Sequence, residues 1–502
     1  MNVTMLLDMA IDGFGDRVVI GRREGGITAA RLGEMAEAGA AVIRESGADS
    51  VVYLAVNGPA FPVALFAAAR AGVPLVPVNY RLGVQQLQSL LAHHPRAIGI
   101  ADEAQAPILR GAGLAVSTPE QWLARCAGPV VSSGEILPDP DGDDAPAVVI
   151  YTSGTTSAPK GVLLRHENLT SYVFGSVEFG SAESTDAALI SVPPYHIAAV
   201  ANTITSLYSG RRTLVLERFT PAQWLQLARE EQITNALVVP TMLARIVESG
   251  EDKSVPSLRS LAYGGAPMPA AVIERALRMW PEVGFVNAYG LTETSSTVAV
   301  LGPEDHRQAL EADEPAMRAR LSSVGRAVPG IDLEIRDENG AVVGPGVTGS
   351  IHVRGEQVSA EYAGIGRMVD DQGFFNTRDQ GHVDEAGYLY IGGRVDDTII
   401  RGAENIAPAE IEEVILRHPA VLDTAVVGVP DDEWGHRIEA AVVVRAGMQL
   451  DPEELRTFVR GVLRSSKTPE RIVYWDELPR TETGKLVRRH VLERIVADDI
   501  AV

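Results

Sequence analysis

Short apolar runs rich in branched residues alternate with helix-period segments in the first part of the chain. Residues 51–56 read VVYLAV, residues 64–72 read ALFAAARAG and residues 73–78 read VPLVPV. The first and third runs have the length and composition of buried strands, and the middle run has the spacing of a helix. This order is typical of a parallel sheet with crossover helices. The pattern therefore predicts an α/β fold with doubly wound sheets.

Three later runs also have the composition of buried strands. They are AVVIY at 147–151, NALVVP at 235–240 and SLAYGG at 260–265. The last two end in turn residues, so we expect both to deliver loops to one edge of a sheet. The first follows SSGEILPDPDGDDAP at 132–146, whose proline and acidic residues predict a linker or a long surface loop.

Short strands and turns replace the helix-period segments at about 321–395. Within this range, DENG at 337–340 and DEAG at 384–387 have the composition of hairpin turns. We therefore expect a β-rich subdomain at the end of a large N-terminal domain.

A helical signal returns after residue 396. Asp451, Pro452 and Glu454 have the spacing of an N-cap, a first-turn proline and a capping-box carboxylate. Apolar residues follow at the spacing of one buried helix face, namely Leu455, Phe458, Val459, Val462 and Leu463. We expect a small α+β domain at about 397–502.

Composition and charge narrow the classes of function. The chain has 502 residues, of which 46% are hydrophobic and 22% charged, as in ordinary globular proteins with more than one core. Its 44 basic and 66 acidic residues give a net charge of −22, which disfavours a nucleic-acid partner. Cys126 is the only cysteine, which excludes an intrachain disulfide and a thiolate zinc site.

The sequence also predicts the compartment. No basic region precedes the N-terminal apolar run, which Asp8 and Asp12 interrupt, so a secretory signal is not supported. The most apolar stretch, near residues 62–78, is broken by Arg70 and Gly72 and is too short to span a bilayer. We expect a cytoplasmic protein without an integral membrane segment.

A loop of hydroxyl and small residues follows the strand at 147–151. It contains Thr152, Ser153, Gly154, Thr155, Thr156 and, at its end, Lys160. Hydroxyl groups and free backbone N–H groups bind phosphate oxygens, and a lysine adds a positive charge. The spacing differs from that of a Walker A loop. Taken alone, such a run is also compatible with an ordinary surface turn.

The full string YTSGTTSAPKG at 151–161 resembles the signature of the adenylate-forming superfamily, which includes acyl-CoA synthetases, luciferases and peptide-synthetase adenylation domains. The resemblance continues in order along almost the whole chain. Its further motifs are AYGGAPMP (262–269), NAYGLTE (287–293), GSIHVRG (349–355), GFFNTRD (373–379), GRVDDTIIRGAENIAPAEIE (393–412) and LPRTETGK (478–485).

This resemblance implies a reaction in which a carboxylate attacks the α-phosphate of ATP and pyrophosphate leaves. The reaction requires Mg²⁺, a nucleotide pocket and charge compensation on the phosphates. By the resemblance, Tyr289 stacks on adenine, Thr292 contacts the α-phosphate and Glu293 binds Mg²⁺. Gly264 and Gly265 allow close approach of the backbone to the nucleotide. The implied ATP contacts also include Ala266, Pro267, Asn287 and Gly290.

Four further residues receive roles from their motifs. Asp379 is expected to hold the ribose hydroxyls, and Arg394 to support the ribose or a phosphate. Lys485 matches the lysine that bridges the α-phosphate and the acyl carboxylate in the transition state, which makes it the leading catalytic candidate. His196, in VPPYHIAA, corresponds to a histidine beside the acyl pocket, although a core histidine with satisfied hydrogen bonds is the alternative.

Asp396 fits the hinge about which the small domain of this superfamily swings. By the resemblance, the large domain covers 1–395 and the mobile small domain 397–502. Arg401, Gly402 and Ala403 then lie where thioester-forming relatives border the CoA tunnel, and Ala403 replaces a usual glycine. This departure predicts a weak or absent CoA step. Two other departures are Ser157 and Arg378, each in place of a common glycine.

The sequence thus predicts an ATP-dependent ligase that forms an acyl-AMP, with CoA as the default acceptor. Two alternatives remain: an enzyme that passes the acyl group to a carrier protein or a partner enzyme, and a non-catalytic nucleotide-binding protein. By the resemblance, peptide-synthetase adenylation domains carry an aspartate in the region of His196 to pair with the substrate ammonium group. This chain has none there, which disfavours an α-amino acid. The small and apolar residues around 192–204 favour a hydrophobic carboxylic acid.

Overall fold

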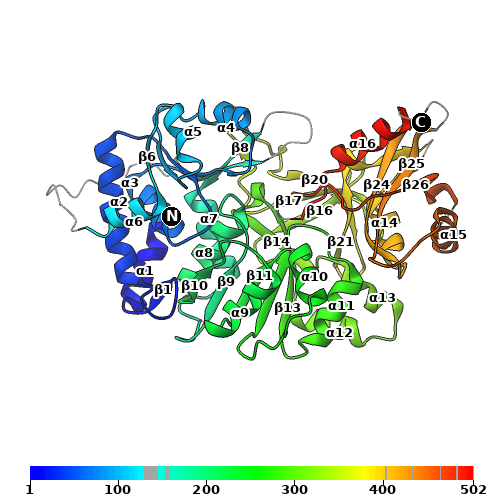
Figure 1. The fold of residues 1–502 in the computed structure, drawn as a ribbon, viewed down its shortest axis with the longest axis horizontal. Helices are drawn as coiled ribbons and strands as arrows, with labels where there is room; N and C mark the ends of the chain where they lie inside the picture. The colour runs from blue at the N-terminus through cyan, green and yellow to red at the C-terminus, as the bar shows by residue number, and fades with distance from the viewer. Residues whose placement is uncertain are drawn as a thin grey trace.

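The structure is a computed structural model that describes residues 1–128, 145–152, 159–401, 404–431, 434–463, 465–481 and 484–500 (Figure 1). Two large sheets, a four-stranded β-subdomain and a small C-terminal domain make up the fold, and the two large sheets each take strands from separate parts of the sequence. Figure 1 shows the C-terminal domain beside strands β20 and β21, at the end of the molecule opposite helices α1–α3. The predicted mixed α/β class is confirmed by this arrangement.

An eight-stranded sheet forms the first layer. Its central strands are parallel, and β8 pairs antiparallel with both β7 and β18. In spatial order the strands are β19 (Gly366–Arg367), β18 (Glu361–Tyr362), β8 (Lys160–Arg165), β7 (Pro146–Thr152), β4 (Leu75–Pro77), β3 (Val51–Leu54), β5 (Ile98–Ala101) and β6 (Ala115–Ser117).

Helices cover both faces of this sheet, which explains why its strands read as continuous apolar runs. Val51 and Tyr53 pack into one core, and Val52 and Leu54 pack into another on the opposite face. The sheet's helices are α1 (Thr4–Phe14), α2 (Ala29–Ser46), α3 (Ala60–Ala71), α4 (Val84–Leu91), α5 (Ala106–Gly111), α6 (Pro119–Cys126) and α7 (His166–Ser176). The expected strands at 51–56, 73–78 and 147–151 and the helix at 64–72 are confirmed.

A nine-stranded sheet forms the second layer. Strands β9–β13 and β1 run parallel, as predicted for the runs at 235–240 and 260–265. Its order is β15 (Arg326–Ala327), β14 (Ser296–Leu301), β13 (Gly284–Leu291), β12 (Ser260–Gly264), β11 (Asn235–Val238), β9 (Ala187–Ile190), β10 (Arg212–Val215), β1 (Val18–Ile20) and β2 (Ile27–Thr28).

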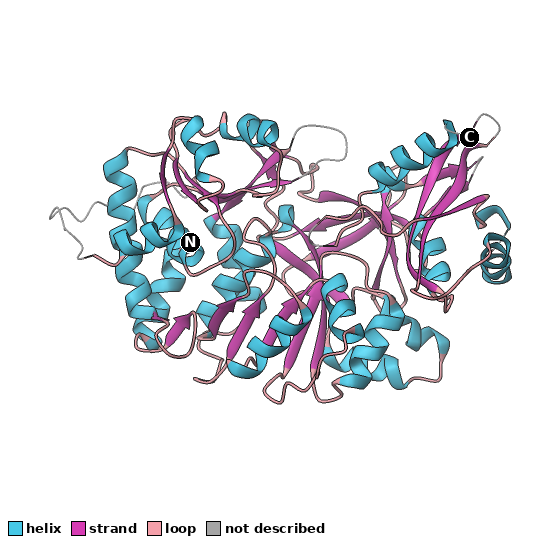
Figure 2. Ribbon diagram, in the orientation of Figure 1, coloured by secondary structure: helices cyan, strands magenta, loops and turns pink. Residues whose placement is uncertain are grey.

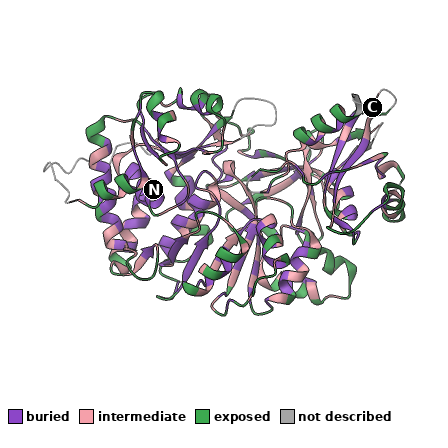
Figure 3. Cartoon of the chain, in the orientation of Figure 1, coloured by how far each residue is buried: buried purple, intermediate pink, exposed green. Residues whose placement is uncertain are grey.

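The second layer has its own helices and its own core. Figure 2 shows helices against the parallel strands, and Figure 3 shows that these strands are buried or half-buried while the outer faces of the helices are exposed. The helices are α8 (Ile197–Ser209), α9 (Pro221–Glu230), α10 (Pro240–Glu248), α11 (Ala270–Met279), α12 (Pro303–Glu311) and α13 (Pro315–Arg318).

The expected β-rich subdomain consists of β16 (Asp332–Arg336), β17 (Gly349–Arg354), β20 (Phe375–Val383) and β21 (Leu389–Arg394). The turn at 384–387 joins β20 to β21, where Gly387 N donates to Asp384 O at 3.0 Å. The turn at 337–340 follows β16, where Gly340 N donates to Asp337 O at 3.0 Å. Both turns lie where the sequence predicts them.

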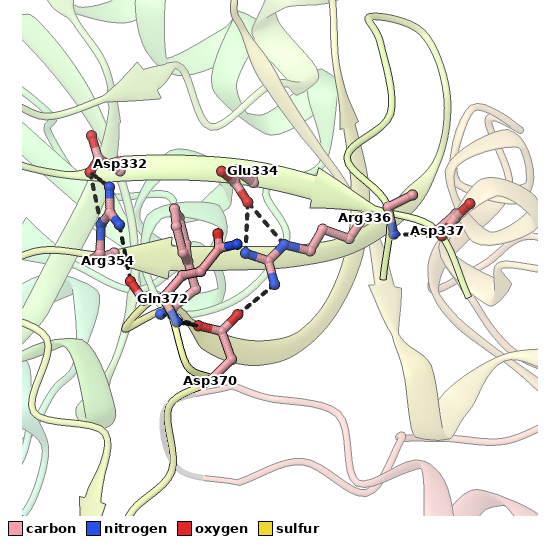
Figure 4. A network of polar contacts seen from close by, with 9 residues as sticks. Asp332, Glu334, Arg336, Asp337, Arg354, Asp370 and Gln372 are labelled. Carbon is pink, nitrogen blue, oxygen red and sulfur yellow. Dashed lines mark hydrogen bonds and ion pairs between the residues drawn. The ribbon is translucent and has the colours of Figure 1, made fainter. Parts of the chain in front are cut away.

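An ion-pair network fixes the segment that leads into β20 (Figure 4). Arg336 contacts Glu334 at 2.7 Å and Asp370 at 2.6 Å, and Arg354 contacts Asp332 at 2.6 Å. The Arg336 hydrogen bond and backbone N–H groups hold the pKa of Asp370 at about 2, although burial opposes this shift. The network thereby fixes the start of the strand that carries Asp379.

The small domain contains β22 (Ile399–Arg401), β23 (Glu404–Ile406), β24 (Val421–Asp431), β25 (Gly435–Val444) and β26 (Arg471–Tyr474), with helices α14 (Pro408–Leu416), α15 (Pro452–Val462) and α16 (Arg488–Ile500). The Asp451 side chain caps α15 by accepting from Glu453 N and Glu454 N, as predicted. Val462 was expected in the buried face, but it is 52% exposed because the helix ends there, beyond its packing partners.

Two other expectations concern burial and membranes. Cys126 is free and buried, as expected of a small hydrophobic residue. Among the described residues, no helix is long and apolar enough to cross a bilayer. The segment at 132–144 of the expected linker lies outside the described residues.

Candidate active site

The ends of β12 and β13 bring two glycine-containing motifs to the same edge of the second sheet. Gly264 ends β12 opposite Ala288 of β13, and a Cβ at Gly264 would lie 2.2 Å from the Ala288 carbonyl oxygen. A Cβ at Gly290 would lie 1.7 Å from the Ser296 carbonyl oxygen. Gly265 follows with φ +82°, in the left-handed region that favours glycine. Backbone packing therefore requires glycine at positions 264 and 290, and backbone conformation favours it at position 265.

Tyr289, Asp379 and Arg394 form one group although they come from two sheets. The Tyr289 hydroxyl donates to Asp379 Oδ2 at 2.6 Å, and Arg394 Nε lies 3.0 Å from Asp379 Oδ1. Asp379 pairs with Arg394 across β20 and β21. Burial, followed by the charge of Asp379 and its hydrogen bond, raises the pKa of Tyr289 well above its usual value. The tyrosine therefore stays neutral and acts as a donor.

Glu293 lies on a 3₁₀ turn, Thr292–Thr294, directly after β13. The Tyr362 hydroxyl donates to Glu293 Oε1 at 2.9 Å, and the Lys160 ammonium lies 5.7 Å from the centre of the Tyr362 ring. Tyr362 reaches this position because it pairs with Val162 of β8. One tyrosine thus connects the end of the phosphate loop to the expected metal-binding carboxylate.

Lys485 enters the same region from the small domain. The residue is exposed as a whole, but the protein around its ammonium group displaces water and lowers its pKa. Arg394 lowers it further, while Asp379, Asp397 and Glu293 act in the opposite direction. These four groups are the charged environment of Lys485. Residues as far apart in sequence as Glu293 and Lys485 therefore meet at one ammonium group.

The loop that carries Lys485 is docked on the large domain. A Cβ at Gly484 would lie 2.3 Å from Thr241 Oγ1, in the first turn of α10. Gly484 also has φ +75°. A side chain at this position would have to displace Thr241, so glycine permits the close approach.

His196 precedes α8, and its ring centroid lies 4.7 Å from that of Tyr195. Burial, followed by the positive charge of Lys485, lowers the pKa of His196 to about 4. The imidazole is therefore neutral near pH 7. Its electrostatic coupling to Lys485 places it beside the other candidate residues, which favours the site interpretation over that of an isolated core histidine.

Two other expected residues, Asn287 and Arg401, form contacts within the protein, and a third, Asp396, lies in a turn. The Asn287 amide donates to Ser323 O at 3.1 Å, so this side chain is directed into the protein. The Arg401 guanidinium forms an ion pair with Glu470 and lies 5.5 Å from the centre of the Trp434 ring. Asp396 lies in a 3₁₀ turn, Val395–Asp397, between β21 and β22.

Only part of the expected phosphate loop and CoA tunnel lies within the described residues. Thr152 and Lys160 face each other at the base of the hairpin between β7 and β8. Ser153, Gly154, Thr155, Thr156 and Ser157, together with Gly402 and Ala403, lie outside the described residues. Ala266 and Pro267 follow Gly265 in the segment between β12 and α11.

The sequence analysis missed three side chains that support the site. Tyr362 contacts Glu293, and Asp397 contributes to the charge around Lys485. Gln357 donates to Thr294 O at 3.1 Å and to Thr297 O at 2.8 Å, which fixes the turn that carries Glu293. No local pattern identifies these residues, because each acts through a distant segment.

The residues present fit a metal ion that arrives with phosphate. No group of three or more possible metal-ligating side chains occurs in the part of the chain that the structure describes. Mg²⁺ bound to nucleotide phosphates requires only one or two carboxylates from the protein. Glu293 would supply such a ligand.

Comparisons with known proteins agree with this geometry. A model of the AMP-binding enzyme family matches residues 7–363, and a model of the AMP-binding enzyme C-terminal domain matches residues 410–485. The chain is 33% identical over 488 residues to an indoleacetate–CoA ligase of Aromatoleum aromaticum, covering 93% of each chain. It is 32% identical over 464 residues to the fatty acid–[acyl-carrier-protein] ligase ScoC of Streptomyces coeruleorubidus, covering 90% of this chain and 87% of ScoC.

The fold also agrees with a solved structure. ATP-bound MatB from Rhodopseudomonas palustris matches with a TM-score of 0.85 and 27% identity, covering 98% of this chain and 99% of MatB. The family model covers more than half of the 502 residues. The chain therefore belongs to the AMP-binding enzyme family and is a carboxylic-acid-adenylating ligase of the acyl-CoA synthetase type.

Proposed function

We propose that this enzyme activates a hydrophobic carboxylic acid with Mg²⁺ and ATP, releases pyrophosphate and then transfers the acyl group to CoA. The observation that carries this proposal is the position of Lys485. The small domain brings its ammonium group into the electrostatic environment of Glu293, Asp379 and Arg394. A cation in such a position can stabilise charge that develops during phosphoryl transfer.

Each residue has a defined task in the adenylation step. An acid oxygen attacks the α-phosphorus of ATP, and the bond between that phosphorus and the oxygen bridging to the β-phosphorus breaks. Lys485 is proposed to reduce the repulsion between the attacking carboxylate and the α-phosphate. Glu293 would supply a carboxylate ligand to the Mg²⁺ that accompanies ATP, and a metal held there would provide positive charge for the phosphates.

Asp379 is proposed to bind the ribose hydroxyls. Its two oxygens already accept from Tyr289 and contact Arg394. An ionised carboxylate offers about four acceptor positions, so two remain for ribose. Because Arg394 and Tyr289 hold both oxygens, the carboxylate is oriented before the nucleotide binds.

The acid is proposed to lie near His196 and the start of α8. Ile197 and Ala198, in the first turn of that helix, are half-buried and carry no charge. The low pKa of His196 keeps the imidazole neutral near pH 7, so it adds no second positive charge beside Lys485. These properties suit an apolar acyl group better than a dicarboxylate.

The acceptor is proposed to be CoA, with a carrier protein as the second candidate. The relatives include a ligase named for CoA and one named for an acyl carrier protein. The direction of Arg401 toward Glu470 and Trp434 shows that its side chain is engaged within the small domain. A substrate panel in which acyl-AMP, acyl-CoA and acyl-carrier products are measured separately distinguishes the acceptors. Comparison of wild type with Ala403→Gly then tests the expected weakness of the CoA step.

Acid-dependent exchange of pyrophosphate into ATP tests the adenylation step itself. The proposal expects exchange that requires the acid, Mg²⁺ and Lys485. Nucleotide binding without exchange, across a panel of fatty, aromatic and polycyclic acids, would favour the non-catalytic alternative and overturn the proposal.

A further inference from the structure

The small domain contacts the large domain at both ends of helix α10. In the first turn, Thr241 packs against Gly484, where a Cβ would lie 2.3 Å from Thr241 Oγ1. At the last residue of the helix, Glu248 Oε1 lies 3.4 Å from Nη1 of Arg445, which directly follows β25. One helix of the large domain therefore carries two contacts with the small domain.

The charge of Glu248 is unfavourable for α10 by itself. A carboxylate in the last turn of a helix lies at the negative end of the helix dipole. Two arginines from different domains compensate this charge. Arg275 of α11 lies 3.0 Å from Glu248 Oε1, and Arg445 lies 3.4 Å from the same oxygen. Part of the compensation is therefore present only when the small domain lies against α10.

Arg275 fixes Glu248 from within the large domain. Its Nε donates to Ala271 O at 3.2 Å, which holds the guanidinium on α11, and its Nη2 donates to Glu248 Oε1 at 3.0 Å. The side chains of Glu248 and Arg445 are 30% and 36% exposed, so water screens their ion pair only in part. Glu248 is thus an oriented acceptor for the small domain.

Strand β24 connects Arg445 to the loop that carries the candidate catalytic lysine. Arg445 N donates at 2.9 Å to the carbonyl oxygen of Ala420, which directly precedes β24. Asp423 of β24 accepts from Arg480 at 2.6 and 3.0 Å. Arg480 also donates to Gly484 O at 2.6 Å, next to the lysine. A shift of Arg445 is therefore transmitted to the lysine.

We propose that Glu248 is a positioning residue for adenylation, which holds the small domain through Arg445 in the orientation that presents Lys485 to the site. The two domains are joined at the 3₁₀ turn Val395–Asp397, and a turn can absorb a rotation between domains. Contacts such as those at α10 then determine the orientation. This inference rests on the proposed function, because the orientation affects the reaction only if Lys485 acts in adenylation.

Spin labels measure the orientation of the small domain directly. Cys126 is the only cysteine and is buried, so cysteines at exposed helix positions, Gln308→Cys on α12 and Thr457→Cys on α15, can be labelled selectively. Double electron–electron resonance gives the distribution of distances between the labels. In Arg445→Gln, the ratio of molecules at the main wild-type distance to all others should fall about two- to fivefold, which corresponds to one partly exposed ion pair.

Acid-dependent exchange of pyrophosphate into ATP measures the effect on the reaction. Arg445→Glu brings two carboxylates together, so it should reduce both the distance ratio and kcat for exchange more than Arg445→Gln does, by about fivefold or more. Arg445→Lys keeps the charge and should stay within about twofold of wild type. The KM for ATP should change less than about twofold, because the proposed nucleotide contacts Asp379 and Glu293 lie in the large domain.

Two controls separate orientation from a general effect of charge. Arg417→Gln removes an arginine that pairs with Glu413 of the same domain at 2.6 Å, and it should change neither exchange nor the distance distribution. Glu248→Gln combined with Arg445→Gln should lower the distance ratio no more than Arg445→Gln alone, because both changes remove one interaction between the domains.

The outcomes separate this inference from the proposed function. Wild-type distance distributions in Arg445→Gln and Arg445→Glu would overturn the role of Glu248 and leave the proposed function intact. Slower exchange with unchanged distances would also overturn it, because the effect would not arise from the orientation of the small domain. Absence of exchange in the wild type across the acid panel would overturn the proposed function, and this inference with it.

Discussion

Replacing Arg488 with glutamine should disrupt the segment that presents Lys485. Arg488 begins α16, three residues after Lys485. Its guanidinium lies 3.3 Å from Asp397 Oδ2 and 2.8 Å from Glu412 Oε2, and it donates to Val426 O at 2.9 Å. One side chain therefore connects the end of the 3₁₀ turn Val395–Asp397, helix α14 and strand β24 to the segment that follows Lys485.

The magnitude follows from burial. The side chains of Arg488, Glu412 and Asp397 are 18%, 13% and 28% exposed. Although burial opposes its charge, Glu412 and Asp397 raise the pKa of Arg488, so it is charged. Removing one partner of a buried ion pair costs about 3–5 kcal/mol, because the remaining carboxylate stays buried without its counter-charge. That is a large fraction of the ~5–15 kcal/mol that stabilises a typical domain.

Hydrogen exchange measured by mass spectrometry reports this loss locally. In Arg488→Gln, peptides from α14, β24 and α16 should lose about 10²–10³-fold or more of their protection, since ~1.4 kcal/mol corresponds to a factor of ten. Pyrophosphate exchange should fall as well, because Lys485 loses the anchor of its loop. Peptides from the nine-stranded sheet should keep wild-type protection.

Two further variants test whether the ion pair between Arg488 and Glu412 causes this loss. Arg489→Gln changes the next residue, which is 62% exposed and lies 3.5 Å from Glu493, so it should cost less than about 0.5 kcal/mol. Glu412→Gln added to Arg488→Gln should cost less than the sum of the single changes, because both remove the same interaction. A loss below about 1 kcal/mol in Arg488→Gln would show that the buried pair does not hold the loop.

Four other predictions concern catalysis and packing. Lys485→Ala should reduce acyl-AMP formation about 10²–10³-fold or more and leave ATP affinity within several-fold; wild-type exchange rates would contradict this. The pKa of Lys485 is lowered and its charged form is the active one, so kcat/KM for ATP should fall with rising pH at a pH below the ordinary lysine pKa of 10.5. In Lys485→Arg this alkaline loss of kcat/KM should move to higher pH. Gly290→Ala should destabilise by more than about 1 kcal/mol in denaturant unfolding because its Cβ meets the Ser296 carbonyl, whereas Gly461→Ala, on an open helix position, should not destabilise. EDTA should abolish turnover and Mg²⁺ should restore it; stoichiometric zinc in active protein would refute the metal prediction.

Local signals in the sequence predict local structure well in this chain. The strand at 147–151, the turn at 384–387 and the Asp451 cap follow from neighbouring residues, and the structure has all three. Val462 shows the limit of periodicity, which indicates the face of a helix but not where its packing partner ends.

The candidate site was predictable only where a contiguous motif carries it. Glu293, Asp379 and Lys485 were identified from motifs, and the structure brings them together. Tyr362, Asp397 and Arg488 were not, because their contacts depend on how distant segments pair. The hydroxyl of Tyr362, for example, reaches Glu293 only after β18 has joined β8.

The pairing of β18 with β8 has a consequence for synthesis of the chain. Val162 and Tyr362 are 200 residues apart (362 − 162), and Arg165 also forms an ion pair with Glu361 at 2.8 Å. At ~5–20 residues per second, the ribosome needs about 10–40 s to deliver the partner of β8. During that interval the first sheet presents an open edge of unpaired N–H and C=O groups, which can pair with another chain. The β8 edge therefore stays unpaired between the synthesis of residues 165 and 361, and co-expressed chaperones that protect this edge should improve the yield.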